Sequence, residues 1–184
     1  MDGTHLTEAA ERISESIREY GEKWFWKQNE KRVGVLSLSA RNDDMLMWAH
    51  YADGHRGLCL ELTMPVNNDL HRITYSKTRP VFHFDDLSKQ WQNQARFERS
   101  IIEILTTKAY DWAYENEWRC IDFGGSGLRP LEESILTGII FGLKTSDEDQ
   151  NAVQGWLDQR SVPLTVYRAQ EHLTKFGVKI DCQD

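Results

Sequence analysis

The sequence predicts an α+β fold, with a single mixed or antiparallel sheet and several packed helices. Stretches with helical periodicity and short runs rich in β-branched residues are intermixed, without the strict strand–helix–strand repetition of a doubly wound sheet. The 184 residues contain 40% hydrophobic side chains and no linker, repeat or low-complexity tract. This size and balance predict one domain spanning residues 1–184.

Helical spacing of apolar residues occurs in four stretches, and the first of them forms an N-terminal segment over residues 1–32. Asn42 or Asp43 is expected to cap the second helix, and Gly54 to end it. The four predicted helices are 6–28, 44–52, 86–109 and 147–159.

Short apolar runs predict the strands, and alternation predicts which residues share a face. Glu115, Glu117 and Arg119 are expected on one face of a strand, and residues 124–127 are expected to form a hairpin turn. The predicted strands are 33–39, 57–63, 73–75, 115–123, 136–141, 164–167 and 176–180. The predicted core residues are Trp48, Leu58, Leu60, Trp118 and Ile140.

Composition limits the classes of function. No run of 18 or more apolar residues occurs, and the N-terminus lacks the features of a signal peptide, so we expect a cytoplasmic protein that does not enter the membrane. The net charge of −7 argues against binding driven by nucleic-acid phosphates. Three widely spaced cysteines form neither a disulfide framework nor a zinc pattern.

A first polar constellation lies in residues 37–57, around a predicted strand–helix–strand turn. Ligands commonly bind at strand ends and helix N-termini, where backbone N–H groups are free, and histidines can transfer protons near neutral pH. In the structural alternative, Asp43 caps a helix, Trp48 and Tyr51 are core residues, and His55 begins a strand. The residues expected to contact substrate here are Ser37, Ser39, Trp48, Tyr51, His55 and, on the next strand, Glu61, with His50 expected to be catalytic.

The second constellation comprises Lys108, Trp112 and residues 114–119 (YENEWR). Two carboxylates on one strand face raise one another's pKa, whereas a neighbouring arginine lowers both. Such a pair could stabilise a cationic transition state, with Glu117 and Glu115 as catalytic residues. The alternative is a solvated ladder of salt bridges that contributes little to stability. Because one domain has few places for two such motifs, we expect residues 44–61 to contact residues 112–119.

Both constellations resemble a large bacterial family, domain of unknown function 2971. The resemblance rests on residues 47–61 (MWAHYADGHRGLCLE), on the second constellation, and on residues 139–142 (IIFG), and it covers about residues 33–142. The family implies no established reaction. Its members usually carry a further N-terminal region that this sequence does not match, which predicts a short or truncated member.

A looser resemblance concerns ADP-ribosyltransferases of the Arg–Ser–Glu type, in which a Ser-x-Ser strand is followed by a Glu-x-Glu strand. It implies that Ser37 and Ser39 support a nicotinamide nucleotide, that Glu117 stabilises the ribosyl cation and that Glu115 orients the acceptor. NAD is then a candidate substrate of a transferase. No arginine strand is evident before Ser37.

Three hypotheses follow. The first is an enzyme acting on a nucleotide-like substrate, with Lys108, Trp112 and Arg119 as further binding residues. The second is a non-catalytic binding or interaction module that recognises a small molecule or nucleotide. The third is a metal-dependent nuclease using Asp43, Asp44, Glu115 and Glu117. Neither acidic pair has a recognised nuclease spacing with a nearby lysine.

Overall fold

The computed structural model describes Glu19, Lys23 and Lys27 and the ranges 31–65, 69–80 and 94–182. Most of the predicted helix over 6–28 and the first part of the one over 86–109 lie outside these residues. Backbone contacts divide the chain into two units, residues 1–36 with 121–128 and residues 37–120 with 129–184. The candidate site lies in the second unit. No helix within the described ranges has the length and apolar character needed to cross a membrane.

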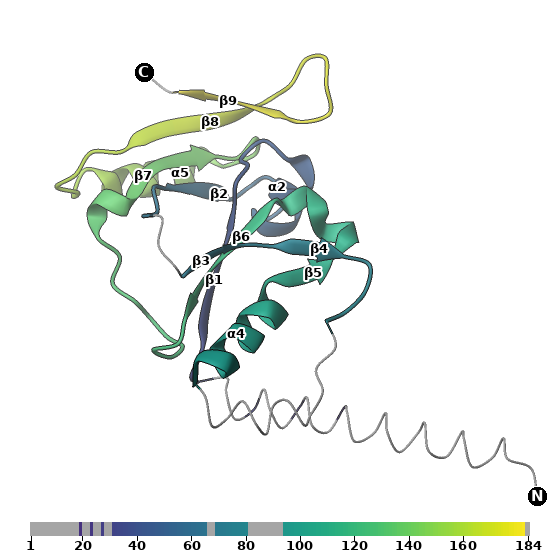
Figure 1. The fold of residues 1–184 in the computed structure, drawn as a ribbon. Coiled ribbons are helices and arrows are strands. Elements are labelled where there is room, and N and C mark those ends of the chain that lie inside the picture. The colour runs from purple at the N-terminus through teal and green to yellow at the C-terminus, as the bar shows by residue number, and fades with distance from the viewer. Residues whose placement is uncertain are drawn as a thin grey trace, which may run out of the picture. The chain divides into compact units, whose positions relative to one another are not determined.

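The described strands form three sheets, so the prediction of an α+β fold is confirmed and that of a single sheet is wrong (Figure 1). The three-stranded sheet has the order β1 (Gly34–Ser39), β6 (Glu117–Asp122), β3 (Leu70–Arg72). The four-stranded sheet has the order β2 (Leu58–Leu62), β7 (Leu136–Phe141), β8 (Thr165–Glu171), β9 (Val178–Cys182). The two-stranded sheet pairs β4 (Thr74–Ser76) with β5 (Thr107–Ala109).

Helices connect these strands: α2 (Met45–Tyr51), α4 (Gln94–Leu105), α5 (Asp147–Leu157) and the 3-10 helices η1 (Tyr110–Glu115) and η2 (Glu133–Ile135). Strands β7 and β8 are parallel and α5 connects them, as a parallel pair requires a crossover. Because β6 and β7 belong to different sheets, the turn at 124–127 does not close the predicted hairpin.

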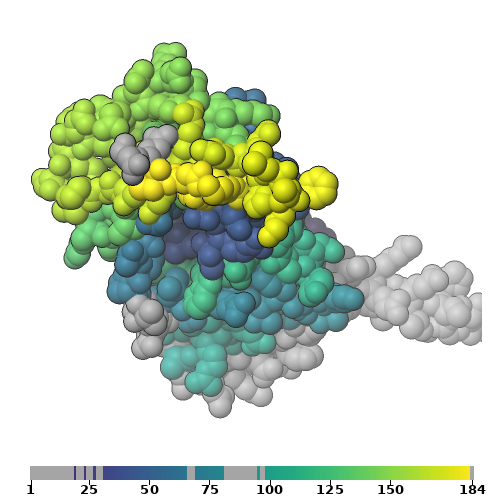
Figure 2. Space-filling model, turned by 90° about the horizontal axis from the view of Figure 1, so that it is seen from above, coloured from purple at the N-terminus to yellow at the C-terminus, as the bar shows by residue number. Residues whose placement is uncertain are grey.

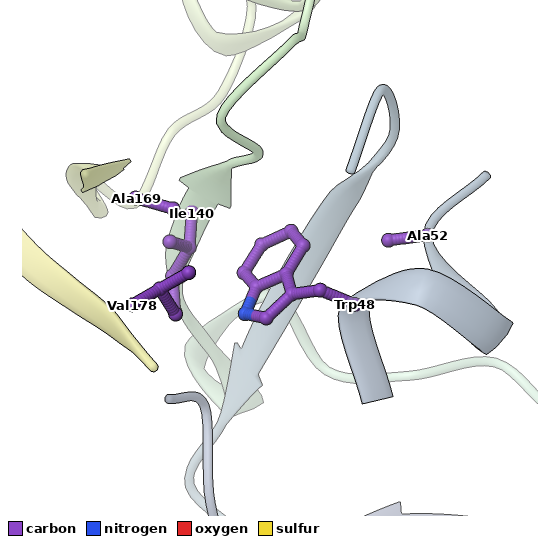
Figure 3. Packing of buried hydrophobic residues seen from close by; sticks show 5 residues of the cluster. All are labelled: Trp48, Ala52, Ile140, Ala169 and Val178. Carbon is purple, nitrogen blue, oxygen red and sulfur yellow. The ribbon is translucent and has the colours of Figure 1, made fainter. Parts of the chain in front are cut away.

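Strand β7 is the centre of the hydrophobic core. Its residues 138–141 are buried, and Ile140 points to one face of the sheet while Ile139 and Phe141 point to the other. A strand covered on both faces has a continuous apolar sequence, which explains the LTGIIF segment. On one face of β7, Ile140 belongs to a buried cluster, which Figure 3 shows. The cluster consists of Trp48, Ala52, Ile140, Ala169 and Val178.

The C-terminal hairpin of β8 and β9 completes this side of the core. The backbone N–H of Val178 donates to the carbonyl of Asp43, 3.3 Å away, just before α2 begins. In the space-filling view the yellow hairpin accordingly adjoins dark-blue residues from the first third of the chain (Figure 2). Trp48 near the start of the second unit is therefore packed against Ala169 and Val178 near its end.

The predicted core is partly confirmed. Trp48 and Ile140 are 3% and 1% exposed, whereas Leu58 and Trp118 are only half-buried. The prediction for Leu60 is wrong, because its side chain is 51% exposed. Leu60 lies on the same face of β2 as Leu58, but β2 is an edge strand, and only the Leu58 end reaches the cluster around Ile139.

Two predicted helix boundaries are also wrong. Helix α2 is capped by Asp44, whose carboxylate accepts from the N–H groups of Leu46 and Met47, and not by Asn42 or Asp43. Helix α4 ends at Leu105 and not at residue 109, because residues 107–109 pair with β4 instead. Pairing with a distant strand therefore overrides the local helical periodicity.

Glycine at position 142 is required by a close approach of two segments. The N–H of Gly142 donates to the carbonyl of Gly57 at 3.1 Å, and the N–H of Lys144 donates to that of His55 at 2.9 Å. A Cβ atom on residue 142 would overlap the His55 carbonyl oxygen and lie 2.8 Å from that of Gly57. Residues 53–55 have consecutive positive φ angles of 47°, 58° and 71°. The backbone of this turn therefore has little conformational freedom to relieve such an overlap.

We therefore expect Gly142→Ala to destabilise the protein by about 1–3 kcal/mol, since backbone must shift to relieve the overlap. Gly155→Ala is the matched control, because Gly155 lies inside α5 and a Cβ atom added there would meet no atom within 4 Å. That substitution should stabilise by about 0.5–1 kcal/mol. Urea unfolding of both variants measures the difference, and equal effects would contradict the close approach.

Candidate functional site

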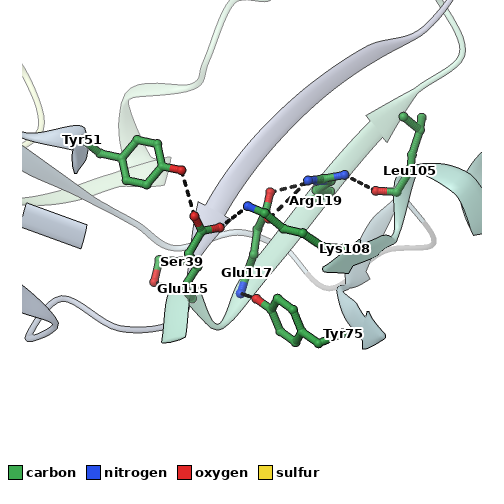
Figure 4. Close-up of polar contacts among 8 residues, drawn as sticks. All are labelled: Ser39, Tyr51, Tyr75, Leu105, Lys108, Glu115, Glu117 and Arg119. Atoms are coloured by element: carbon green, nitrogen blue, oxygen red, sulfur yellow. Dashed lines mark hydrogen bonds and ion pairs between the residues drawn. The ribbon is translucent and has the colours of Figure 1, made fainter. Parts of the chain in front are cut away.

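The two predicted constellations meet in space, as expected. The hydroxyl of Tyr51, at the end of α2, donates to Oε1 of Glu115 at 2.8 Å, although the two residues are 64 positions apart. The rings of His50 and Trp112 also approach, with their centroids 6.3 Å apart. Figure 4 shows the polar part of this site, which is built from β1, α2, β4, α4, β5, η1 and the start of β6.

The two glutamates lie on different elements, so the prediction that Glu115 shares a strand face with Glu117 and Arg119 is wrong. Glu115 is the last residue of η1, and β6 begins at Glu117. Between them Asn116 has a φ of 46°, a left-handed conformation that asparagine tolerates better than most residues. The chain turns at Asn116, yet both carboxylates still reach the same lysine.

Lys108 on β5 connects the two glutamates. Its ammonium group contacts Oε2 of Glu115 and lies 2.9 Å from Oε2 of Glu117. Arg119 binds both oxygens of Glu117, at 2.8 Å and 3.2 Å, and also donates to the carbonyl of Leu105. We call these four charged residues, Lys108, Glu115, Glu117 and Arg119, the ion network.

The ion network is not the solvated ladder of the structural alternative. Glu115 is 2% exposed and Glu117 5% exposed, whereas the side chains of Lys108 and Arg119 are 20% and 18% exposed. Two carboxylates buried this deeply are stable as anions only because two cations and further donors surround them. The four charged side chains therefore form a specific, buried arrangement. The local sequence pattern does not predict this burial.

The hydrogen bonds fix the charge state of the network. Burial raises the pKa of Glu117, but hydrogen bonds from Arg119, Lys108 and Ser37 outweigh it and lower the pKa to about 2. Burial lowers the pKa of Lys108, but its contacts with Glu115 and Glu117 outweigh burial, so its pKa lies above the ordinary value. At neutral pH Glu117 is thus an anion and Lys108 a cation.

This depressed pKa predicts a pH dependence of stability. A carboxyl group whose pKa is about 2 when folded and near 4.5 when unfolded stabilises the protein above pH 4.5 and loses that contribution as the pH falls toward 2. The gap in unfolding free energy between the unmodified protein and Glu117→Gln should therefore narrow as pH falls from about 5 to about 3. Urea titrations at several pH values measure the gap, and a constant gap would contradict the assignment.

The serine strand lies next to the glutamate strand, because β1 and β6 are neighbours in one sheet. Ser39 donates from Oγ to the carbonyl of Glu115 at 2.8 Å, and Ser37 hydrogen-bonds to the carboxylate of Glu117. Both serines are exposed residues at the edge of the ion network. The structure thus joins Ser37 and Ser39 to the predicted catalytic pair.

Tyr75 on β4 is a site residue that the sequence pattern did not indicate. Its hydroxyl accepts from the backbone N–H of Glu117 at 2.8 Å and so fixes the point where β6 begins. The apolar residues Ile73 and Tyr75 predict a strand, and in that pattern Tyr75 serves only as a hydrophobic residue. A buried tyrosine usually finds a polar partner, and that tendency was the available clue.

An aromatic group adjoins the ion network at Lys108. The ring centroids of His50, Trp112 and Tyr114 are separated by 6.3, 6.5 and 6.0 Å, so each ring contacts the other two. The ammonium of Lys108 lies 5.1 Å from the centroid of Trp112. His50 is exposed and Trp112 is 40% exposed, which leaves this aromatic surface open to solvent.

Three predicted binding residues have other partners. Trp48 is a core residue whose indole N–H donates to the carbonyl of Asn42, and its ring stacks with His55 at 6.3 Å. Burial and the nearby Lys144 lower the pKa of His55. Glu61 on β2 accepts from the hydroxyl of Thr137 at 2.9 Å, in the four-stranded sheet.

The acidic residues of the nuclease hypothesis do not converge. Asp43 pairs with Arg41 at 2.9 Å, Asp44 caps α2, and Glu115 and Glu117 bind Lys108. Among the residues that the structure describes, no three or more His, Cys, Asp or Glu side chains are grouped so that they could hold a metal ion. The geometry thus gives this hypothesis no support.

Comparison with known proteins agrees with the resemblance derived from the sequence. The model of a family described as protein of unknown function (DUF2971) matches residues 47–120. This span contains the ion network, Tyr51 and the aromatic group, whereas Ser37, Ser39 and residues 139–142 fall outside it. No curated protein and no solved structure matches the chain significantly.

Proposed function

We propose that the DUF2971 domain of this chain is an enzyme that acts on a nucleotide-like substrate, with Glu117 opposing a positive charge that develops during the reaction. The observation that carries the proposal is the environment of Glu117: a buried carboxylate held on both oxygens by cations, with a pKa lowered to about 2. A fixed charge in a site of low dielectric stabilises an opposite charge better than the same group in water.

Cleavage of an N-glycosidic bond creates such a charge. The bond between the sugar carbon and the base nitrogen breaks, the electron pair leaves with the base, and positive charge develops on the sugar. An acceptor oxygen, from water or from a hydroxyl group, then bonds to that carbon and loses its proton. In this proposal Glu117 stabilises the cationic sugar, while Glu115 and the Tyr51 hydroxyl bound to it orient the acceptor. His50, exposed beside them, accepts the proton.

Lys108 and Arg119 compensate the charge of Glu117 before substrate binds. A substrate phosphate that accepts a hydrogen bond from Lys108 would draw this lysine from Oε2 of Glu117, which lies 2.9 Å away. Arg119 would remain to hold the carboxylate in place through its two hydrogen bonds. Substrate binding would thereby increase the net negative charge near the sugar.

The adjacency of β1 and β6 supports a transferase that uses NAD. Ser37 bonds to Glu117, and Ser39 bonds to the Glu115 carbonyl, so the Ser-x-Ser and Glu-x-Glu segments act as one unit. The test is nicotinamide release from NAD by the unmodified protein, with and without hydroxyl acceptors. Metal-dependent cleavage of nucleic acid is assayed in parallel, and cleavage without nicotinamide release would favour the nuclease.

The completeness of the ion network favours a second candidate, a binding module. Both carboxylates are already paired with cations, and paired charges can serve structure alone. A module of this kind would bind a nucleotide-like molecule on the aromatic surface without converting it. Ligand binding together with absent turnover, measured on the same preparation, would favour the module over the enzyme.

A further inference from the structure

His55 connects the end of helix α2 to the segment that follows β7. Its backbone N–H donates to the carbonyl of Trp48 at 3.2 Å, and its carbonyl accepts from the N–H of Lys144 at 2.9 Å. Its ring stacks on the indole of Trp48, with the centroids 6.3 Å apart and the planes at 11°. Both the backbone and the ring of His55 therefore contribute to holding α2 against the core.

The Nδ1 atom of this ring is shielded from solvent, although the residue as a whole is half-buried. Within the described ranges it is the only buried side-chain nitrogen or oxygen without a hydrogen-bond partner. Buried polar atoms normally have such a partner. We assign the proton of the neutral ring to Nε2, because a proton on Nδ1 would be buried without an acceptor.

The turn around His55 offers no compensation for a positive charge on the ring. Lys144, on the segment bound to His55, carries the same sign of charge. Burial and this lysine together lower the pKa of His55. The carboxylate of Asp53, in the same turn, is occupied by Arg56, which donates to both of its oxygens at 3.0 and 3.1 Å.

The four-stranded sheet offers no closer compensation. Cys59 and Tyr167 pack against the cluster around Trp48, and a thiol and a phenol carry no charge in acidic solution. Glu61 follows on the same face of β2, and its carboxylate accepts from the hydroxyl of Thr137 at 2.9 Å. A protonated His55 would therefore lie beside a lysine, while the nearby carboxylates bind other groups.

We propose that His55 is a pH-sensitive switch that controls the position of helix α2. While the ring is neutral, it stays stacked on Trp48, and α2 holds the Tyr51 hydroxyl 2.8 Å from Glu115. A proton taken from mildly acidic solution onto Nδ1 creates a charged, buried donor without an acceptor, and the ring leaves the stack. The end of α2 then loosens and Tyr51 withdraws from Glu115, whatever reaction the site performs.

The direction of the pH effect follows from linkage. A histidine in the unfolded chain titrates near pH 6.5, whereas burial lowers the pKa of His55 in the folded protein. Its contribution to stability is therefore complete above pH 6.5 and is lost as the pH falls below that value. Glu117 acts in a separate window, because its contribution is lost between pH 4.5 and about 2. Attraction of a protonated ring to the indole face of Trp48 opposes the effect but supplies no acceptor for Nδ1.

Nitrogen NMR of the histidine rings in the full-length protein tests the switch. We expect Nδ1 of His55 to be bare and Nε2 to be protonated at neutral pH, with a titration midpoint below 6.5. The indole N–H of Trp48, which donates to the carbonyl of Asn42 at 2.7 Å, should change its resonance over the same pH range. A proton on Nδ1 at neutral pH, a midpoint at or above 6.5, or an indole resonance that does not follow His55 would overturn the proposal.

His55→Asn removes the titrating group and keeps a residue that tolerates the positive φ of 71°. Between about pH 6.5 and 5.5, the folding equilibrium constant of the unmodified protein should fall relative to that of this variant by as much as about 10-fold. His50→Asn is the matched control, because His50 is an exposed histidine on α2, and its variant should follow the unmodified protein. Urea unfolding measures the constants, and parallel pH curves for His55→Asn and the unmodified protein would contradict the switch.

The coupling to the site has a test of its own. Tyr51→Phe removes the hydroxyl that binds Glu115 and keeps the ring. Because linkage is reciprocal, weakening the hold on α2 should move the titration of His55 to higher pH. Tyr110→Phe is the matched control, since Tyr110 is a 57% exposed tyrosine on η1, and it should leave that titration unchanged. The same His55 midpoint in both variants would overturn the coupling. None of these measurements depends on turnover, so they stand apart from the test of the proposed enzyme.

Discussion

Replacing Lys108 with methionine should destabilise the protein by about 3–5 kcal/mol, because it leaves two buried carboxylates with one compensating cation. Methionine keeps most of the volume and the flexible chain of lysine, so the loss reports the charge. Glu115 is affected most, since Lys108 is its cationic partner among the described contacts, whereas Glu117 keeps Arg119. Urea unfolding at neutral pH measures the change in free energy.

Lys23→Met provides the matched control. Lys23 forms an ion pair with Glu19 at 2.7 Å, but the two side chains are 75% and 68% exposed. Surface pairs of this kind contribute little to stability, because solvent screens them. Adding Glu115→Gln to Lys108→Met should recover part of the stability, because it removes one uncompensated charge. Similar losses in Lys108→Met and Lys23→Met would show that the ion network is not buried in solution.

Glu117→Gln should reduce turnover by about 100-fold or more, which is typical when one electrostatic partner of a transition state is removed. Glutamine keeps the shape of the side chain but removes the charge opposite the cationic sugar. Activity is measured at a temperature where circular dichroism shows the variant to be folded, because Arg119 loses its carboxylate partner and Lys108 loses one of two. Nicotinamide release from NAD is the readout.

Glu171→Gln is the control for this variant. Glu171 is an exposed residue at the end of β8, so the same chemical change there should leave the rate unchanged. If Glu117→Gln retains the original rate while folded, Glu117 has no part in the reaction. A loss of the same size in both variants would point to a general effect of lost negative charge.

Periodicity and residue type predicted the elements whose form is decided locally. The continuous apolar run of β7 and the short helix α2 follow from neighbours in the sequence, although the cap of α2 is Asp44 and not Asn42 or Asp43. The meeting of the two motifs was also predictable, because a chain of this size has few sites for so many polar and aromatic groups. The bond between Tyr51 and Glu115 confirms it.

The features that the sequence did not reveal depend on distant partners. Strand alternation placed Glu115 beside Glu117, but the left-handed Asn116 separates them onto two elements. Leu60 has the alternation of a core residue, yet its position on an edge strand leaves it exposed. The division into three sheets depends on which strands pair, and the alternation within one strand does not identify its partner elsewhere in the chain.

The packing of Trp48 has a practical consequence for choosing the ends of a fragment to express. The family match ends at residue 120, but three of the buried residues around Trp48, namely Ile140, Ala169 and Val178, come after it. A fragment limited to residues 47–120 would lose β7, β8 and β9 and leave the indole in water. It would retain every charged residue of the site and still not fold around them. Expression trials should therefore extend at least to the end of β9 at Cys182, well beyond the matched segment.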